Sequence, residues 1–189
     1  MLLLLSDLWH VIAEHHVAWL VTVVLIVGSV IDAIELKVPN WLTYPFIVSG
    51  WIYAFAAFGF YGLLWSVLGT GVAMACLLPM YSIGGMGAGD VKLLAGVGAW
   101  LSIQHTVWGF VIGVFIGAAM GIAMALASGQ WKHHYQQFWA IAREIITIRN
   151  PERLSEIAAE RKPRMRLLPY GVPMATGCIC YYIAMGLLV

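Results

Sequence analysis

The feature that most constrains this chain is its succession of long apolar runs, separated by short polar segments. Hydrophobic residues make up 62% of the sequence and charged residues 10%, whereas a soluble globular domain carries about 25% charged residues. A helix that crosses a membrane needs about 20 mostly apolar residues. Six candidate runs lie at roughly 10–31, 41–59, 62–83, 90–103, 106–128 and 169–189, of which the run at 90–103 is short for a full span. We therefore predict an all-α, polytopic integral membrane protein with about six transmembrane helices, in which residues 1–189 form one membrane-embedded domain.

The basic residues predict how these helices are oriented. With six spans and the N-terminus outside, all ten lysines and arginines lie on or close to the cytoplasmic side, as the positive-inside rule requires. None of them precedes Lys37, so the basic start of a cleaved signal peptide is missing and we expect the first run to remain as a span. The polar stretch at about 129–168 is predicted to be a cytoplasmic insert that begins with an interfacial helix on the inner leaflet.

The cysteines and histidines do not predict a metal site or a cofactor. Cys76, Cys178 and Cys180 lie in apolar runs and form no CxxC pair, which argues against a zinc ribbon or a disulfide framework. His133 and His134 are adjacent and therefore cannot share one face of a helix as metal ligands would. We expect no metal and no cofactor.

Two aspartates at the ends of apolar runs carry the chemistry that the sequence predicts. An ionisable residue in a membrane segment is costly and is by default a candidate functional residue. Asp32 ends the first run and Asp90 begins the fourth, and the predicted topology puts both at the cytoplasmic side. Two carboxylates that share a site hold one proton between them, so that one takes a proton from water while the other protonates a peptide carbonyl. Asp32 and Asp90 are therefore predicted to be a catalytic pair of the aspartic-protease kind.

Residues around the pair have two interpretations each. The glycine-rich stretch "GGMGAG" before Asp90 permits a sharp bend and a close approach of backbone, so Gly87 and Gly89 are expected to shape a site for an extended substrate. A glycine-rich turn before an aspartate is also an ordinary helix start with Asp90 as its N-cap. Glu35 lies one helical turn after Asp32 and either tunes the site or is a solvated charge. Lys92 is expected first to reach the membrane surface and only second to contribute to the site.

Three stretches resemble a known family. Gly87 to Asp90, "GAGD", matches the GxGD motif of intramembrane aspartyl proteases, and "GAGDVKLLAGVGAWLS" is similar to the second motif of the type IV prepilin leader peptidases, including Lys92. The stretch "DAIELKVPNWLT", which starts at Asp32, resembles the first motif of that family, in which Pro-Asn follows the aspartate by some seven residues; here these are Pro39 and Asn40. The stretch "LPYGVPMATG" at 168–177 resembles its C-terminal Pro-Tyr-Gly-Pro segment, with one valine inserted.

The resemblance implies a membrane-embedded aspartic endopeptidase that cleaves the short basic leader of prepilin-like precursors at the cytoplasmic face of a bacterial inner membrane. Asp32 and Asp90 would be its catalytic pair, with Pro39 and Asn40 among the residues that shape the site. Larger members carry paired CxxC motifs and also methylate the new N-terminus. This sequence lacks those motifs, so the resemblance implies a short form that cleaves without methylation. The expected partners are the precursor and the lipid bilayer, and no nucleic acid.

The main alternative is a small proton- or ion-coupled transporter, since intramembrane acids mark ion paths as readily as proteolytic sites. A transport site is expected near the middle of the bilayer, whereas both aspartates are predicted at one face. A scaffold protein with an inactive protease fold is a third interpretation, against which the presence of both aspartates argues.

Overall fold

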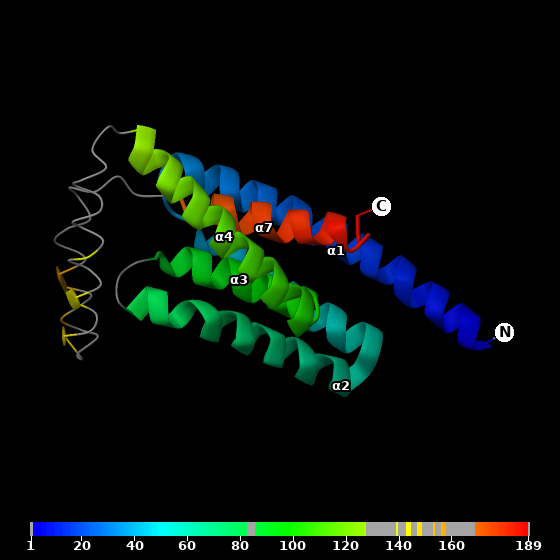
Figure 1. Cartoon of the computed structure of the whole chain (residues 1–189). Coiled ribbons are helices and arrows are strands. Elements are labelled where there is room, and N and C mark those ends of the chain that lie inside the picture. Colours follow the sequence, from blue (N-terminus) through cyan, green and yellow to red (C-terminus); the bar gives the residue numbers. More distant parts are fainter. Residues whose placement is uncertain are drawn as a thin grey trace.

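The chain is helical throughout the residues that the computed structural model describes, which are 2–82, 86–127, 169–188 and a few isolated positions between 139 and 157. Side chains are described from His15 onward. No strand occurs in this part of the chain, in agreement with the predicted all-α class. The main helices are α1 (Leu2–Glu35), α2 (Asn40–Ser82), α3 (Ala88–Trp100), α4 (Ile103–Ala127) and α7 (Gly171–Ala184), shown in Figure 1.

Three of the described helices are long and apolar enough to cross a membrane. The apolar stretches run over His15–Glu35, Asn40–Tyr81 and Ile103–Ala127. α3 has 13 residues and α7 has 14, which is fewer than the roughly 20 that a full crossing needs. The predicted run at 169–189 thus forms a shorter helix than expected, whereas α3 has about the length of the short run predicted at 90–103. The number of about six spans stays a prediction.

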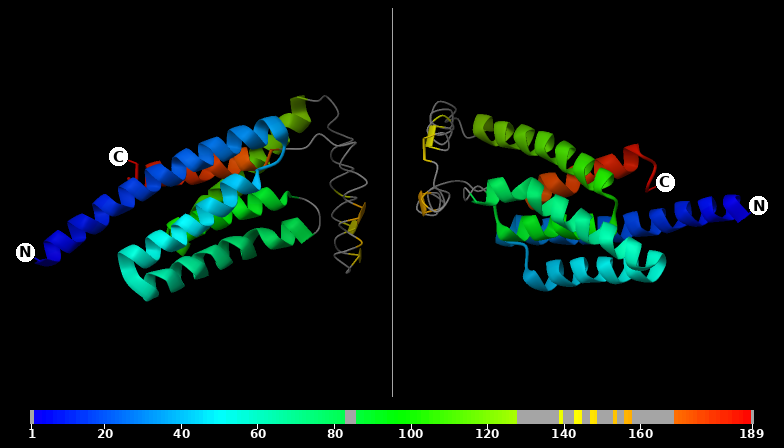
Figure 2. Two further views of the ribbon diagram at one scale, coloured as in Figure 1. Left: turned by 180° about the vertical axis from the view of Figure 1, so that it is seen from behind. Right: turned by 90° about the horizontal axis from the view of Figure 1, so that it is seen from below.

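The long helix α2 reverses direction within its length. Gly59 has φ 65° and ψ −155°, a backbone conformation that glycine adopts without the steric cost of a Cβ atom. The chain folds back at this point, so that residues 40–58 and 60–82 form two arms that lie side by side (Figure 2). The indole N–H of Trp51 donates to the hydroxyl of Thr70 at 3.0 Å and joins the arms. The predicted runs at 41–59 and 62–83 correspond to these arms.

The helices pack closely where glycines meet. α3 packs mainly against α2, and α7 packs against α4 and α1. Gly69 of α2 faces Gly98 of α3, and Gly113 of α4 faces Gly177 of α7, with no room for a Cβ atom in either pair. Small residues of this kind let helix backbones touch, as is usual in membrane proteins.

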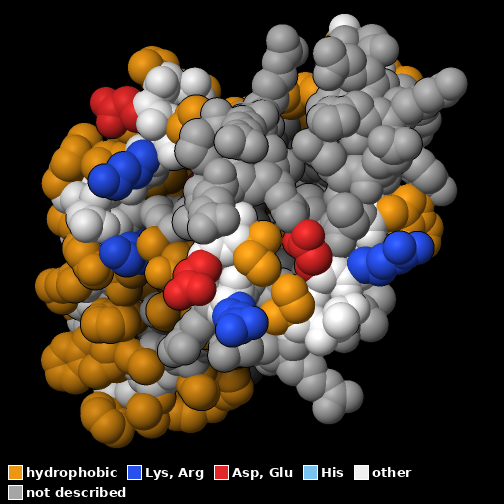
Figure 3. Space-filling model, turned by 90° about the vertical axis from the view of Figure 1, so that its left-hand side faces the viewer, with side chains coloured by type: hydrophobic (Ala, Val, Ile, Leu, Met, Phe, Trp, Pro, Cys, Tyr) orange, Lys and Arg blue, Asp and Glu red, His pale blue; other side chains and the backbone are white. Residues whose placement is uncertain are grey.

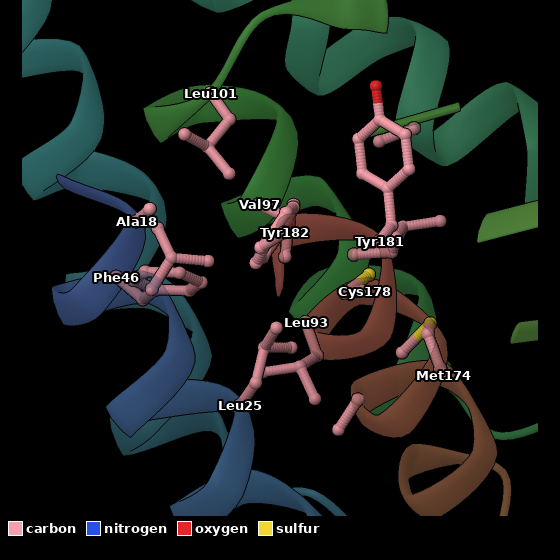
Figure 4. Packing of buried hydrophobic residues seen from close by; sticks show 14 of the residues in the cluster. Ala18, Leu25, Phe46, Leu93, Val97, Leu101, Met174, Cys178, Tyr181 and Tyr182 are labelled. Atoms are coloured by element: carbon pink, nitrogen blue, oxygen red, sulfur yellow. The ribbon is translucent and has the colours of Figure 1, made fainter. Parts of the chain in front are cut away.

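The interior of the bundle holds both short helices. Leu25 of α1, Leu93 and Val97 of α3, and Cys178 and Tyr182 of α7 are fully buried in one apolar cluster. Figure 4 shows these side chains gathered between α1, α3 and α7. The buried faces of α3 and α7 thus share one interior with α1.

One end of the bundle collects the features that the sequence assigned to the cytoplasmic side. α1 ends there, and α3 and α7 begin there (Figures 1 and 2). Seen from that end in Figure 3, acidic and basic side chains lie together, beside a hydrophobic flank. The predicted interfacial helix in the insert at 129–168 falls almost entirely outside the described residues.

Candidate active site

Asp32 and Asp90 come together at this end of the bundle. Asp32 lies in the last turn of α1 and is 3% exposed, and Asp90 lies in the first turn of α3 and is 5% exposed. The two carboxylates are close enough to interact electrostatically. Residues that are far apart in the sequence thus form one buried pair of acids, the arrangement predicted from their positions at the ends of apolar runs.

Asp32 is held by the start of α7. The backbone N–H of Gly171 donates to Oδ2 of Asp32 at 2.8 Å. Gly171 is the first residue of α7, so its N–H is one of those that a helix leaves without an intrahelical acceptor. The carboxylate supplies that acceptor. No role was predicted for Gly171, and the only sequence signal that pointed to it was the Pro-Tyr-Gly stretch within "LPYGVPMATG".

Asp90 does not cap α3. Gly87 occupies the N-cap position, and Asp90 is the third residue of the helix, so the alternative interpretation of Asp90 as an N-cap is wrong. Its Oδ2 lies beside Gly87, whose backbone interacts with the carboxylate. Its Oδ1 is buried and has no hydrogen-bond partner among the described residues. A buried oxygen left in this state is costly, and this cost is relieved when a ligand or a second carboxyl group bonds to it.

Gly87 and Gly89 differ in what they face. Gly87 is exposed, and its role in a substrate site stays a prediction. Gly89 lies against the linker between α1 and α2, where a Cβ atom would stand 2.7 Å from the carbonyl oxygen of Val38 and 3.0 Å from its nitrogen. The backbone that passes Gly89 is therefore the chain's own. This contact connects the helix that carries Asp32 to the helix that carries Asp90.

Lys92 and Asn40 connect α3 to the start of α2. The ammonium group of Lys92 donates to Oδ1 of Asn40 at 2.8 Å and lies 4.6 Å from the centre of the Tyr44 ring, within the range of a cation–π contact. The carbonyl of Pro39 accepts the first backbone hydrogen bonds of α2. Pro39 and Asn40 thus stand at the start of α2, and Asn40 also binds α3 through Lys92. Glu35 is exposed at the end of α1, and the partner of Lys92 is Asn40 rather than this acid.

The end of α1 contains a strained residue. Leu36 has φ 54°, in the left-handed region that a branched side chain rarely adopts. Its N–H donates to the carbonyl of Asp32 at 2.8 Å and closes the last turn of the helix. The chain therefore turns out of α1 directly after the turn that carries Asp32.

No group of three or more histidine, cysteine or acidic side chains that could hold a metal ion occurs among the residues that the structure describes. His133 and His134 lie outside the described residues. The chemistry offered by the described part of the site is that of two neighbouring carboxyl groups, which can exchange protons with water and with a carbonyl.

Comparison with known proteins identifies a family. The family model described as the type IV leader peptidase family matches residues 19–122, more than half of the chain. The matched region includes both Asp32 and Asp90 and ends before α7. No curated protein and no solved structure matches the chain.

Proposed function

Since the match shows that the chain belongs to the type IV leader peptidase family, we propose that it is a membrane-embedded aspartic endopeptidase that removes the leader of prepilin-like precursors. Family membership by itself supports a leader peptidase in general terms. The observation that carries the finer proposal is the meeting of two buried carboxylates, Asp32 and Asp90, at one end of the helix bundle.

The pair has the groups that peptide hydrolysis needs. One carboxylate, in its ionised form, takes a proton from water as the water oxygen bonds to the carbonyl carbon of the scissile peptide. The other, in its protonated form, donates its proton to the carbonyl oxygen. When the tetrahedral intermediate collapses, the C–N bond breaks and a proton passes to the leaving amine. Burial removes competing water and strengthens both electrostatic interactions.

The place of the pair in the bundle supports cleavage at the cytoplasmic face. Asp32 is in the last turn of α1 and Asp90 is in the first turn of α3, near the end where charged side chains gather (Figure 3). A transporter would instead require its acids near the middle of the bilayer. The sequence contains no CxxC pair, and N-methylation is therefore not part of the proposal.

Cleavage in membranes tests the proposal. The chain is co-expressed with a panel of prepilin-like precursors, and loss of the leader is followed by gel shift and mass spectrometry. Asp32→Asn and Asp90→Asn keep the size of each side chain, and each is expected to lower cleavage by about a thousandfold or more, because half of the acid–base pair is lost. Asp7→Asn, at the third aspartate of the chain, is the matched control and should cleave like the unmodified protein.

The results separate the alternatives. Cleavage that survives both substitutions would show that the aspartic mechanism is wrong. If no precursor is cleaved, a proton-flux measurement on the same variants tests the transport alternative.

A further inference from the structure

We propose that Gly171 is a positioning residue for the catalytic pair, whose backbone N–H holds Asp32 in the ionised form, so that Asp32 activates water while Asp90 carries the proton. The catalytic part of this inference rests on the proposed function. The charge assignment itself does not, since it follows from how the two carboxyl groups are surrounded.

The contact to Asp32 favours a negative charge. The N–H of Gly171 can only donate, and it lies 2.8 Å from Oδ2 within a buried environment. A hydrogen bond from a backbone N–H stabilises the ionised carboxylate relative to the acid. Gly171 is also the first residue of a helix, so the partial positive charge of the α7 N-terminus acts in the same direction.

One carboxylate oxygen of Asp90, Oδ1, receives no hydrogen bond from the described residues. The backbone of Gly87 interacts with the carboxylate, and Asp90 also lies in the first turn of a helix, so part of its surroundings resembles that of Asp32. Its Oδ1, however, is buried and receives no hydrogen bond from any described residue. A proton on this group would supply an O–H donor, which can bond to the neighbouring carboxylate or to a substrate carbonyl.

The other titratable groups of the described structure do not reverse this assignment. Tyr170, directly before α7, interacts with Asp90, and as a neutral phenol at ordinary pH it adds no charge. Glu35 and Lys37 are exposed at and just after the end of α1. Lys92 is bonded to Asn40 on the side of α3 that faces α2.

Glycine at this position leaves Asp32 undisturbed. A Cβ atom on residue 171 would stand 2.9 Å from Oδ2 and 3.1 Å from Cβ of Asp32. A side chain at this position would press on Asp32 and force its carboxylate to shift by a few tenths of an ångström. The absence of a side chain is therefore what allows the start of α7 to reach the site, across 139 residues of sequence.

A measurement that needs no substrate can test the charge assignment. The chain contains three aspartates, so protein made with aspartate labelled at its carboxyl carbon gives three NMR signals, which the single Asp→Asn variants assign. Titration in detergent then reports the ionisation of each group. The contact is removed by a backbone ester at Gly171, in which an oxygen replaces the N–H and no Cβ is added. A backbone ester at Val172, whose N–H donates to the carbonyl of Pro169 instead, is the matched control.

We expect the Asp32 signal to titrate at lower pH than the Asp90 signal. The ester at Gly171 should raise the midpoint of Asp32 by about one pH unit, the size expected for one lost hydrogen bond to a charged group, and the ester at Val172 should leave it within a few tenths. If Asp90 titrates first, or if both esters have the same effect, the inference is wrong. Gly171→Ala keeps the N–H but adds the Cβ, and it should raise the midpoint less than the ester does.

Cleavage kinetics separate this inference from the proposed function. In the variant with a backbone ester at Gly171, the acidic limb of the pH profile of kcat/KM should move to higher pH. The size of this shift should equal the shift of the Asp32 midpoint in the NMR titration. If the titrations agree with expectation and no precursor is cleaved, the charge assignment stands and the proposed function fails. If cleavage occurs with an unchanged acidic limb, the proposed function stands and the role of Gly171 fails.

Discussion

Gly89→Ala tests whether the α1–α2 linker sets the distance between the two aspartates. The added Cβ would stand 2.7 Å from the carbonyl oxygen of Val38, whereas ordinary contact begins at 3.4 Å. The linker and the start of α3 must therefore separate by about 0.7 Å, the difference between these two distances. The nearest atom belongs to the backbone, so a side-chain rotation at Val38 cannot relieve the contact.

The expected effect on activity is larger than the effect on stability. A displacement of about 1 Å at reacting groups can cost about a hundredfold in rate, so we expect kcat/KM for precursor cleavage to fall by roughly ten- to a hundredfold. Overpacking costs about 1–3 kcal/mol of folding free energy, and the better helix propensity of alanine offsets about 1 kcal/mol of that. The variant should therefore remain folded, with a slightly lower melting temperature.

The assay is cleavage kinetics in detergent or in membranes, with thermal unfolding measured on the same samples. Gly121→Ala is the matched control, because a Cβ at that position would meet nothing within 4 Å. If Gly89→Ala cleaves within about threefold of the unmodified protein, the linker does not position the pair and the geometric reasoning is refuted.

Three further predictions concern contacts around the site and within α2. Leu36→Gly removes the strain of a left-handed leucine and should raise the free energy of unfolding by about 1 kcal/mol, measured by thermal unfolding. Lys92→Met and Asn40→Ala should each lower cleavage by roughly three- to tenfold, and the double variant should be no worse than the poorer single variant, because both remove the same hydrogen bond. Trp51→Phe should lower stability by about 1 kcal/mol. Thr70→Val removes the same contact and also the bond from the Thr70 hydroxyl to the carbonyl of Ser66, so the double variant should cost less than the sum of the two single variants.

A control substitution and the double variants show which outcomes would contradict these predictions. Leu68→Gly, at an exposed leucine within α2, should destabilise the protein by about 1 kcal/mol, opposite in sign to Leu36→Gly. If both substitutions destabilise the protein equally, the positive φ of Leu36 carries no strain. For each of the two pairs, additive effects in the double variant would show that the hydrogen bond contributes nothing.

The sequence was sufficient to predict the helical class and the pair of acids. Long apolar runs must form helices in a bilayer, because every backbone N–H and C=O has to be satisfied within its own segment. Asp32 and Asp90 stood out because ionisable groups are costly at the ends of such runs. The lengths of the helices were harder to predict. The run predicted at 169–189 forms a helix of only 14 residues, because the apolar pattern continues past the residue at which the helix ends.

The contacts that complete the candidate site were decided only by the tertiary structure. Gly171 bonds to Asp32, Gly89 lies against Val38, and Asp90 lies beyond the N-cap with one oxygen that no described residue bonds. Each of these facts depends on the distance between segments that are remote in the sequence. Local propensity acts over a few residues, whereas these distances follow from how the apolar faces of α1, α3 and α7 fill one common interior. The residue pattern therefore determined which acids stand at the ends of apolar helices, and the packing of the helices decided what surrounds them.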